Sequence, residues 1–230
     1  MRTRSTQKLI LESALRLFNE EGTTPVSHSQ IAIGAGIARS HLHYHFPSKR
    51  EIVLSLFQQL AARMDAGWYD DHRNATLAHM AVMYVRYLRQ ILEYRFFYRE
   101  MTALLRDDPL LALRYNQNRE KRIAELARFF RELERVGALR NIEGHLETLV
   151  ASTWILCDSW PNYLEIQGRE LTLQSALEGY ASVLTVLSPF LTSDSSTVLE
   201  EAETTIAQIL EISQPPLLRT TGKAGDALSN

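Results

Sequence analysis

Residues 27–49 constrain the fold of this chain most, because they read as two short helices joined by a tight glycine turn. Ser27 is a favoured helix N-cap, and Gln30 stands three residues later, in the spacing of a capping box. Gly36 can adopt the positive φ that ends a first helix. A second helix is then expected over 39–46, ended by a proline at the next position. Two short helices at such a turn are typical of a helix-turn-helix, an arrangement that reads DNA.

The second of these helices is expected to have one buried and one exposed face. On a helical wheel of about 100° per residue, Leu42 and Phe46 fall close together on the apolar side. Ser40 and Tyr44 point the opposite way, with histidines on the flanks and Arg39 at the leading edge. Hydroxyl, imidazole and guanidinium groups suit phosphate oxygens and base edges. This face is therefore the candidate DNA-reading surface.

The alternating histidines of the same helix also allow a metal-site interpretation. On a helix His41 and His45 lie one turn apart, but His43 points about 200° away from each. One metal ion therefore cannot bind all three unless the segment is extended. No acidic residue flanks them to orient the imidazoles. We prefer DNA contact and predict no metal.

Residues 31–49, IAIGAGIARSHLHYHFPSK, resemble the DNA-binding signature of the tetracycline-repressor (TetR) family of bacterial regulators. The family pattern runs Ile-Ala, a small residue, Gly, an aliphatic residue, a reading helix with an aromatic-histidine-Phe end, and Ser-Lys. This chain departs from it at Ala38, where a Ser or Thr cap is usual. It also departs at His41 and His43, where Thr and Tyr are common. The matching positions are Ile31, Ala32, Ala35, Gly36, Ile37, Leu42, Tyr44, His45, Phe46, Ser48 and Lys49.

The resemblance implies how the chain is divided and what each part binds. The implied fold is all-α, with an N-terminal helix-turn-helix three-helix DNA-binding domain over 1–50 and a C-terminal helical bundle for effector binding and dimerisation over 51–212. Residues 213–230 are predicted to be a disordered tail. The implied partners are a palindromic double-stranded DNA operator, a small-molecule effector and a second copy of the chain. The implied function is a homodimeric transcriptional repressor that the effector releases from its operator.

The motif and the resemblance together assign residues to the DNA-binding domain. Ile31, Ile37, Leu42 and Phe46 are expected to form its core. The side chains expected to contact bases or phosphates are Ser27, Arg39, Ser40, His41, His43, Tyr44, His45 and Lys49.

Charge is distributed unevenly along the chain. The formal net charge is −2, but the first 53 residues carry seven Lys or Arg and four Asp or Glu, whereas the remainder carries 18 and 23. A basic head on an acidic body suits one module that faces DNA and one that stays off it. Arg2 and Arg4 form a short basic arm, for which two interpretations stay open: a solvated terminus, or a contact with DNA phosphates or the minor groove.

The rest of the chain shows helical periodicity and no strand-like alternation. Asp108 and Pro109 form a helix start, with an acid at the positive end of the helix dipole and proline in the first turn. The helices expected outside the DNA-reading motif cover 6–21, 49–66, 76–93, 96–105, 107–136, 144–167, 171–191 and 197–212.

Aromatic side chains are frequent in the expected body and have two interpretations. They fill the core, or they surround an apolar pocket between helices, where ligand sites form in bundles. The resemblance favours the pocket, and Pro161 within a helix would bend its wall. The candidate pocket residues are Tyr84, Tyr87, Phe97, Tyr98, Met101, Trp154, Cys157 and Trp160.

The resemblance also implies a dimer closed by the helices 144–167 and 171–191 of each subunit, packed as a four-helix bundle. The apolar stripe of the second helix is wider than a lone surface helix needs. We therefore expect Leu177, Tyr180 and Leu184 at the dimer interface.

No catalytic arrangement is visible, so the chain is not expected to be an enzyme or to need a cofactor. The glycines at 34 and 36 lack the GK[ST] or βαβ setting of phosphate-binding loops. The alternative function is a helical ligand-binding module, or a small helical enzyme that uses Cys157 or Asp158 without binding DNA. A single cysteine, no signal peptide and no apolar run of about 18 residues predict a cytoplasmic protein without a membrane partner.

Overall fold

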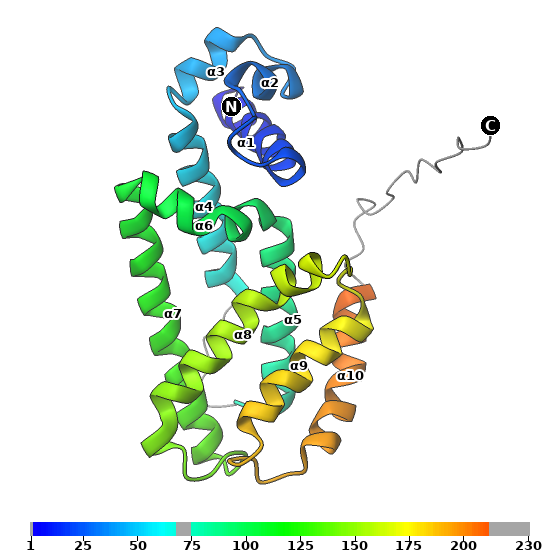
Figure 1. The fold of residues 1–230 in the computed structure, drawn as a ribbon. Coiled ribbons are helices and arrows are strands. Elements are labelled where there is room, and N and C mark those ends of the chain that lie inside the picture. The colour runs from blue at the N-terminus through cyan, green and yellow to red at the C-terminus, as the bar shows by residue number, and fades with distance from the viewer. Residues whose placement is uncertain (1, 68–74, 212–230) are drawn as a thin grey trace, which may run out of the picture.

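A computed structural model describes residues 2–67 and 75–211, which form ten α-helices, one 3-10 turn and no strand. The predicted tail, 213–230, lies outside the described residues. No helix in the described part of the chain is long and apolar enough to cross a membrane. The molecule is elongated, with the N-terminal helices at one end and a larger helical body at the other (Figure 1).

The head is built from three helices, as the sequence predicted. They are α1 (Arg2–Glu21), α2 (His28–Gly34) and α3 (Arg39–His45). α1 begins four residues earlier than expected, so the segment predicted as a basic arm continues the helix. Ile31 and Leu42 are completely buried beneath α2 and α3, Phe46 is 6% exposed, and Ile37 is partly buried against them.

The body consists of seven α-helices, five of which start at a side-chain cap. Asp108 caps its helix by accepting hydrogen bonds from the N–H groups of Leu110 and Leu111, with Pro109 at the first position. The helices are α4 (Lys49–Gly67), α5 (Leu77–Glu93), α6 (Arg95–Asp107), α7 (Pro109–Arg135), α8 (Leu146–Ile166), α9 (Leu173–Leu187) and α10 (Ser195–Glu211), with the 3-10 turn Glu143–His145 before α8. Of these, α6 and α8 start without a side-chain cap.

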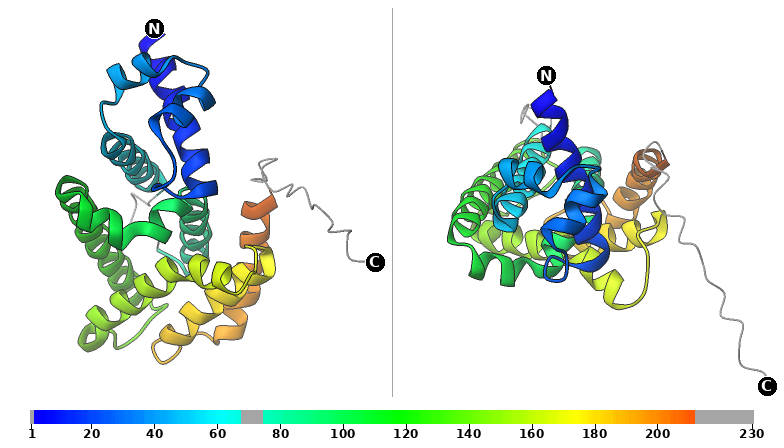
Figure 2. Two further views of the ribbon diagram at one scale, coloured as in Figure 1. Left: turned by 45° about the horizontal axis from the view of Figure 1, so that its top comes forward. Right: turned by 90° about the horizontal axis from the view of Figure 1, so that it is seen from above.

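The head and the body share a continuous core. α4 runs from the head down into the body, and α6 crosses beneath α1 (Figures 1 and 2). One cluster of buried side chains extends from α1 through α4 to Phe96 and Phe97 of α6. The domain boundary predicted at residue 50 lies in the first turn of α4, and the core continues across it. The three-helix head packs directly on the body. A movement of α4 or α6 would therefore shift α1 and the rest of the head.

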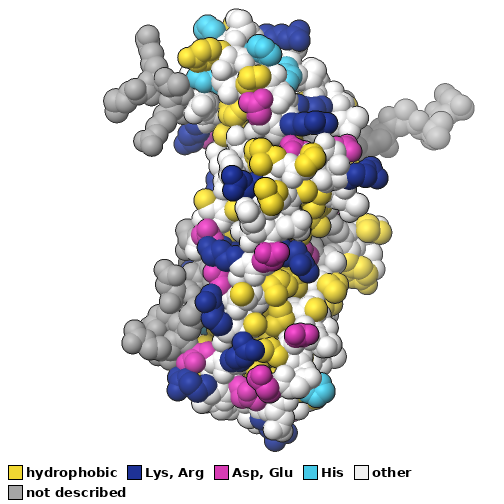
Figure 3. All heavy atoms as spheres, turned by 90° about the vertical axis from the view of Figure 1, so that its left-hand side faces the viewer, with side chains coloured by type: hydrophobic (Ala, Val, Ile, Leu, Met, Phe, Trp, Pro, Cys, Tyr) yellow, Lys and Arg dark blue, Asp and Glu magenta, His cyan; other side chains and the backbone are white. Residues whose placement is uncertain are grey.

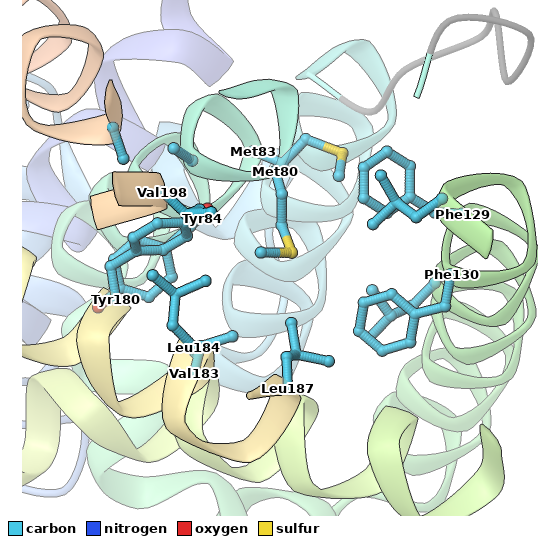
Figure 4. Packing of buried hydrophobic residues seen from close by; sticks show 14 of the residues in the cluster. Met80, Met83, Tyr84, Phe129, Phe130, Tyr180, Val183, Leu184, Leu187 and Val198 are labelled. Atoms are coloured by element: carbon cyan, nitrogen blue, oxygen red, sulfur yellow. The ribbon is translucent and has the colours of Figure 1, made fainter. Parts of the chain in front are cut away.

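A second core occupies the interior of the body, between α5, α7, α8, α9 and α10. Met80 and Met83 of α5 face Phe129 and Phe130 of α7, and α9 closes the space from the other side (Figure 4). Tyr84 and Tyr180 lie together with ring centroids 5.4 Å apart.

The prediction that Tyr180 and Leu184 form the dimer interface is wrong. Tyr180 is fully buried, and its hydroxyl donates to the carbonyl of Leu77 at 3.1 Å. Leu184 is 2% exposed and points into the same core (Figure 4). The wide stripe on α9 exists because α9 is covered by α5, α8 and α10 of its own chain. Leu177 is only partly buried and stays accessible to a partner.

Candidate DNA-reading surface and body cavity

The placement of α2 and the turn that follows it depend on a cap and on two glycines. Ser27 forms the predicted capping box: its hydroxyl accepts from the N–H of Gln30 at 3.3 Å, and its own N–H donates to the Gln30 side chain at 2.9 Å. Gly36 has φ +67°, a conformation that other residues rarely adopt. A Cβ at Gly34 would lie 2.3 Å from the Ser13 hydroxyl, so only glycine lets α2 approach α1 this closely. These features fix how α2 lies against α1 and where α3 begins.

α3 presents its polar side chains to solvent. Tyr44 is 82% exposed, and no packing need explains an exposed aromatic ring of this size. Its ring meets that of His45 edge-on, with centroids 5.2 Å apart. Histidine side chains gather at this end of the molecule (Figure 3). The exposed members of the predicted DNA-binding set are Ser27, Arg39, Ser40, His41, His43 and Tyr44, whereas His45 and Lys49 are half-buried.

His28 belongs to this surface, although the sequence analysis did not select it. Burial lowers the pKa of its imidazole, and the positive charges of Arg39, His43 and Lys49 lower it further. Groups from the starts of three helices therefore converge at this point of the head. Its position directly after the Ser27 cap was the only signal available in the sequence. Such a concentration of positive charge attracts phosphate.

Lys49 is placed differently from the phosphate-binding role predicted for it. Its ammonium donates to the carbonyl of Thr23, to that of Thr24 at 3.2 Å and to that of Val26 at 3.0 Å. Three acceptors use all three of its hydrogens. Burial lowers the pKa of the ammonium, and Glu100 on α6 partly opposes that shift. The geometry therefore favours a structural tie that holds the loop before α2 to the start of α4.

We expect Lys49→Met to lower the free energy of unfolding by about 1–2 kcal/mol, because three loop carbonyls lose a charged donor. The slope of log affinity for DNA against log salt should stay unchanged. A lost phosphate contact would flatten that slope by about one unit. The measurements are urea denaturation and anisotropy titrations at several salt concentrations. Arg50→Met, which removes an exposed charge at the next position, is the matched control. A flatter slope for Lys49→Met alone would restore the predicted role.

The end of α1 is also tied to the body through α6. The side chain of Asn19 donates to the carbonyl of Glu93 at 2.8 Å and accepts from the N–H of Phe96 at 3.0 Å. Glu100 accepts from the N–H of Thr23 at 2.9 Å and from its hydroxyl. Hydrogen bonds at both ends of this contact join the base of the head to α6.

The interior of the body contains a cavity of about 60 Å³ between α5, α7, α8 and α9. Its wall is apolar apart from a few hydroxyls and a thiol. The hydroxyls of Tyr84 and Thr153 are buried in this wall and make no hydrogen bond within the described part of the chain. A bound molecule with a polar group could satisfy them. The lining residues are Met80, Met83, Tyr84, Tyr87, Leu126, Thr153, Trp154, Cys157, Tyr180 and Val183.

Half of the eight predicted pocket residues line this cavity, and one more lines a second recess. Tyr98 borders a smaller recess of about 10 Å³ on the α4 side of the same region. Phe97 instead stacks on Phe57 in the shared core, at 5.2 Å between centroids. Trp160 donates its indole N–H to the carbonyl of Ser175 at 2.9 Å. Tyr84, Tyr87, Trp154 and Cys157 thus line the larger cavity, whereas Phe97, Met101 and Trp160 line neither space.

Cys157 is a small, partly buried side chain packed against the body core. Burial raises the pKa of its thiol to about 12, with a further contribution from the charge of Asp158. A thiol that stays protonated at neutral pH is a poor nucleophile. Among the described residues, no three His, Cys, Asp or Glu side chains gather as a metal site would require.

Two family models match the chain along its length. Residues 10–56 match the model described as "Bacterial regulatory proteins, tetR family", and residues 56–199 match the one described as "Bacterial transcriptional repressor". The chain belongs to the TetR family. It is therefore a DNA-binding transcriptional regulator and not an enzyme, as its sequence predicted.

Individual relatives agree with the TetR assignment. A TetR-family regulator from Marinobacter aquaeolei VT8 superimposes with a TM-score of 0.77 and 27% identity, over 86% of this chain and 97% of that one. A TetR regulator from Haloarcula marismortui shares the fold, with a TM-score of 0.67 and 15% identity over 81% and 98% of the two chains. The regulator EthR of Mycolicibacterium smegmatis is 39% identical over 59 residues, which span only about a quarter of each protein (26% of this chain and 27% of EthR).

Proposed function

We propose that this protein is a homodimeric repressor that binds a palindromic operator through α3 and is released by a small molecule bound in the body. The observation that carries the DNA-binding part is the exposed face of α3. It presents a guanidinium, hydroxyls and imidazoles on a helix held by a buried Leu42 and a glycine turn. Groups of these types contact base edges and phosphates in the major groove.

The dimer is proposed to form through the outer face of α8 together with Leu177 of α9. Ile155 is 61% exposed, Tyr163 48% and Ile166 86%. On a wheel of about 100° per residue, Ile155, Ser159 and Ile166 fall within 40° of one another. Asp158 is the only charged residue between positions 148 and 163, and it faces inward. An exposed apolar stripe without charge is typical of a subunit interface.

The effector is proposed to bind in the cavity between α5, α7, α8 and α9. Its unsatisfied hydroxyls supply polar contacts, and its apolar wall supplies buried area. A ligand changes operator affinity only if it prefers one arrangement of the head over another, and coupling of about 1–3 kcal/mol is typical. α4 and α6 carry such a change to the head because both pack on α1.

The DNA-reading role is tested by substituting α3 and measuring binding to duplexes that the protein itself selects from a random pool. Arg39→Ala and Tyr44→Ala should each weaken binding about 5- to 150-fold, as the loss of a base or phosphate contact does, at about 1–3 kcal/mol. Arg114→Ala, which removes an exposed charge on α7, is the control and should leave the affinity unchanged. Selection of no preferred duplex, or equal binding by all variants, would contradict the proposal.

A further inference from the structure

Asp158 of α8 is a partly buried acidic side chain among the aromatic rings that line a recess of the body. The hydroxyl of Tyr87 donates a hydrogen bond to its carboxyl group. Within the described ranges it has no ion-pair partner, and Arg119 acts on it only from a distance. Burial raises the pKa of the carboxyl to about 6, while hydrogen bonds from Tyr87 and Trp154 oppose that shift. At neutral pH the site therefore holds a negative charge that no cation of residues 2–67 or 75–211 neutralises by contact.

Aromatic rings from five helices line the recess that holds this carboxyl, including Phe57 of α4. Tyr87 of α5 and Trp154 of α8 lie with ring centroids 6.0 Å apart. Tyr98 of α6 and Tyr115 of α7 also line the recess. The faces of aromatic rings are electron-rich and attract organic cations, and several rings around one site reinforce the effect. A carboxylate within such a set of rings favours a positively charged group over a neutral or negative one.

Tyr87 and Trp154 also line the larger apolar cavity. The recess and the cavity therefore share a wall made of these two side chains. The cavity is also lined by methionine, leucine and valine side chains, which suit a hydrocarbon chain. The recess alone, at about 10 Å³, has room for one water molecule. A larger head group would have to displace the ring of Tyr87 or Trp154.

We infer that the effector is an amphiphilic organic cation, with its ammonium group against Asp158 and its hydrocarbon part in the larger cavity. This inference rests on the proposed function, in which a molecule bound in the body releases the operator. The α4 side of the recess is lined by Phe57, Leu60 and Met64. A head group that enlarges the recess pushes on α4 and, through α4, on the reading head. Cation binding should therefore lower operator affinity.

The pH dependence of cation binding follows from the groups that face Asp158. They are Tyr87 of α5, Tyr98 of α6, Tyr115 and Arg119 of α7, and Cys157 on its own helix, whereas α4 contributes only apolar side chains. Burial raises the pKa values of the three tyrosines and of the cysteine, so these groups stay neutral below pH 8. A bound cation favours the ionised carboxylate. Affinity should thus rise as pH increases through about 6, and level off above it.

The test compares three ten-carbon probes on the full chain by calorimetry: decyltrimethylammonium below its micelle concentration, 1-decanol and decanoate. The cation should bind most tightly. Asp158→Asn should weaken cation binding about tenfold or more and leave decanol binding unchanged, because only the charged contact is lost. Arg119→Gln should strengthen cation binding, because it removes a like charge from the rim. Asp107→Asn, an exposed carboxylate on α6, is the charge-matched control and should have no effect.

Equal binding of the three probes, preference for decanoate, or full cation affinity in Asp158→Asn would overturn the inference. Binding of none of them would also overturn it, while operator binding by the same preparation would leave the DNA-reading proposal intact. If the protein binds the cation but selects no DNA, the proposed repressor function would be refuted and the proposed cation site supported. If Asp158→Asn does not fold, Arg119→Gln provides the test: tighter cation binding supports the inference, and unchanged or weaker binding overturns it.

Discussion

Replacing Leu184 by glutamate is expected to unfold the subunit rather than to separate two subunits. Leu184 is 2% exposed and packs inside the body core, where α5, α8 and α10 cover α9 (Figure 4). Removing a buried leucine side chain costs about 2–5 kcal/mol, and an unpaired buried carboxylate adds to that loss. The total should exceed about 4 kcal/mol, against a typical domain stability of about 5–15 kcal/mol. Far-UV circular dichroism and urea denaturation measure it.

Leu177→Glu is the matched control, because it places the same charge two turns earlier on the same helix, at a position that is only partly buried within its own subunit. This variant should keep its helical content but sediment as a monomer, since the proposed interface includes α9 near this residue. If Leu184→Glu remains folded and dissociates, the interface as first predicted from the sequence would be right and the buried position assigned to Leu184 wrong.

The second large effect is expected at Arg122, in the middle of α7. Its side chain is completely buried and forms an ion pair with Glu125 at 2.6 Å and another with Asp65 at the end of α4. Arg122→Met leaves Glu125, only 8% exposed, without its partner. Breaking a buried ion pair from one side costs about 3–5 kcal/mol, because the remaining charge is uncompensated. The expected loss of unfolding free energy in urea is of that size.

Two further variants separate the burial of this ion pair from its charge. Lys121 pairs with the same Asp65 at 2.8 Å but is about half-exposed, so Lys121→Met should cost at most about 1 kcal/mol. The double variant Arg122→Met, Glu125→Met should recover much of the loss, since well-packed apolar side chains can replace a buried pair. Equal losses for Arg122→Met and Lys121→Met would show that burial does not govern this contact.

The sequence predicted the helices well because their boundaries depend on local chemistry. Ser27 with Gln30 and Asp108 with Pro109 start helices wherever the rest of the chain lies. The exposed face of α3 could be derived in the same way, since its periodicity places Tyr44 opposite the buried Leu42. The DNA-reading surface is formed by a short, continuous helix, so most of it can be predicted from the sequence alone.

The tertiary structure decided which partner each face meets. The apolar stripe on α9 predicts that Tyr180 and Leu184 are buried. It does not tell whether another subunit or α5 of the same chain buries them. Lys49 resembles a phosphate ligand until the loop carbonyls of Thr23, Thr24 and Val26 are found around its ammonium. The aromatic surroundings of Asp158 come from helices far apart in the chain. Capping and periodicity act over a few residues, whereas burial and charge depend on contacts that only the folded chain creates.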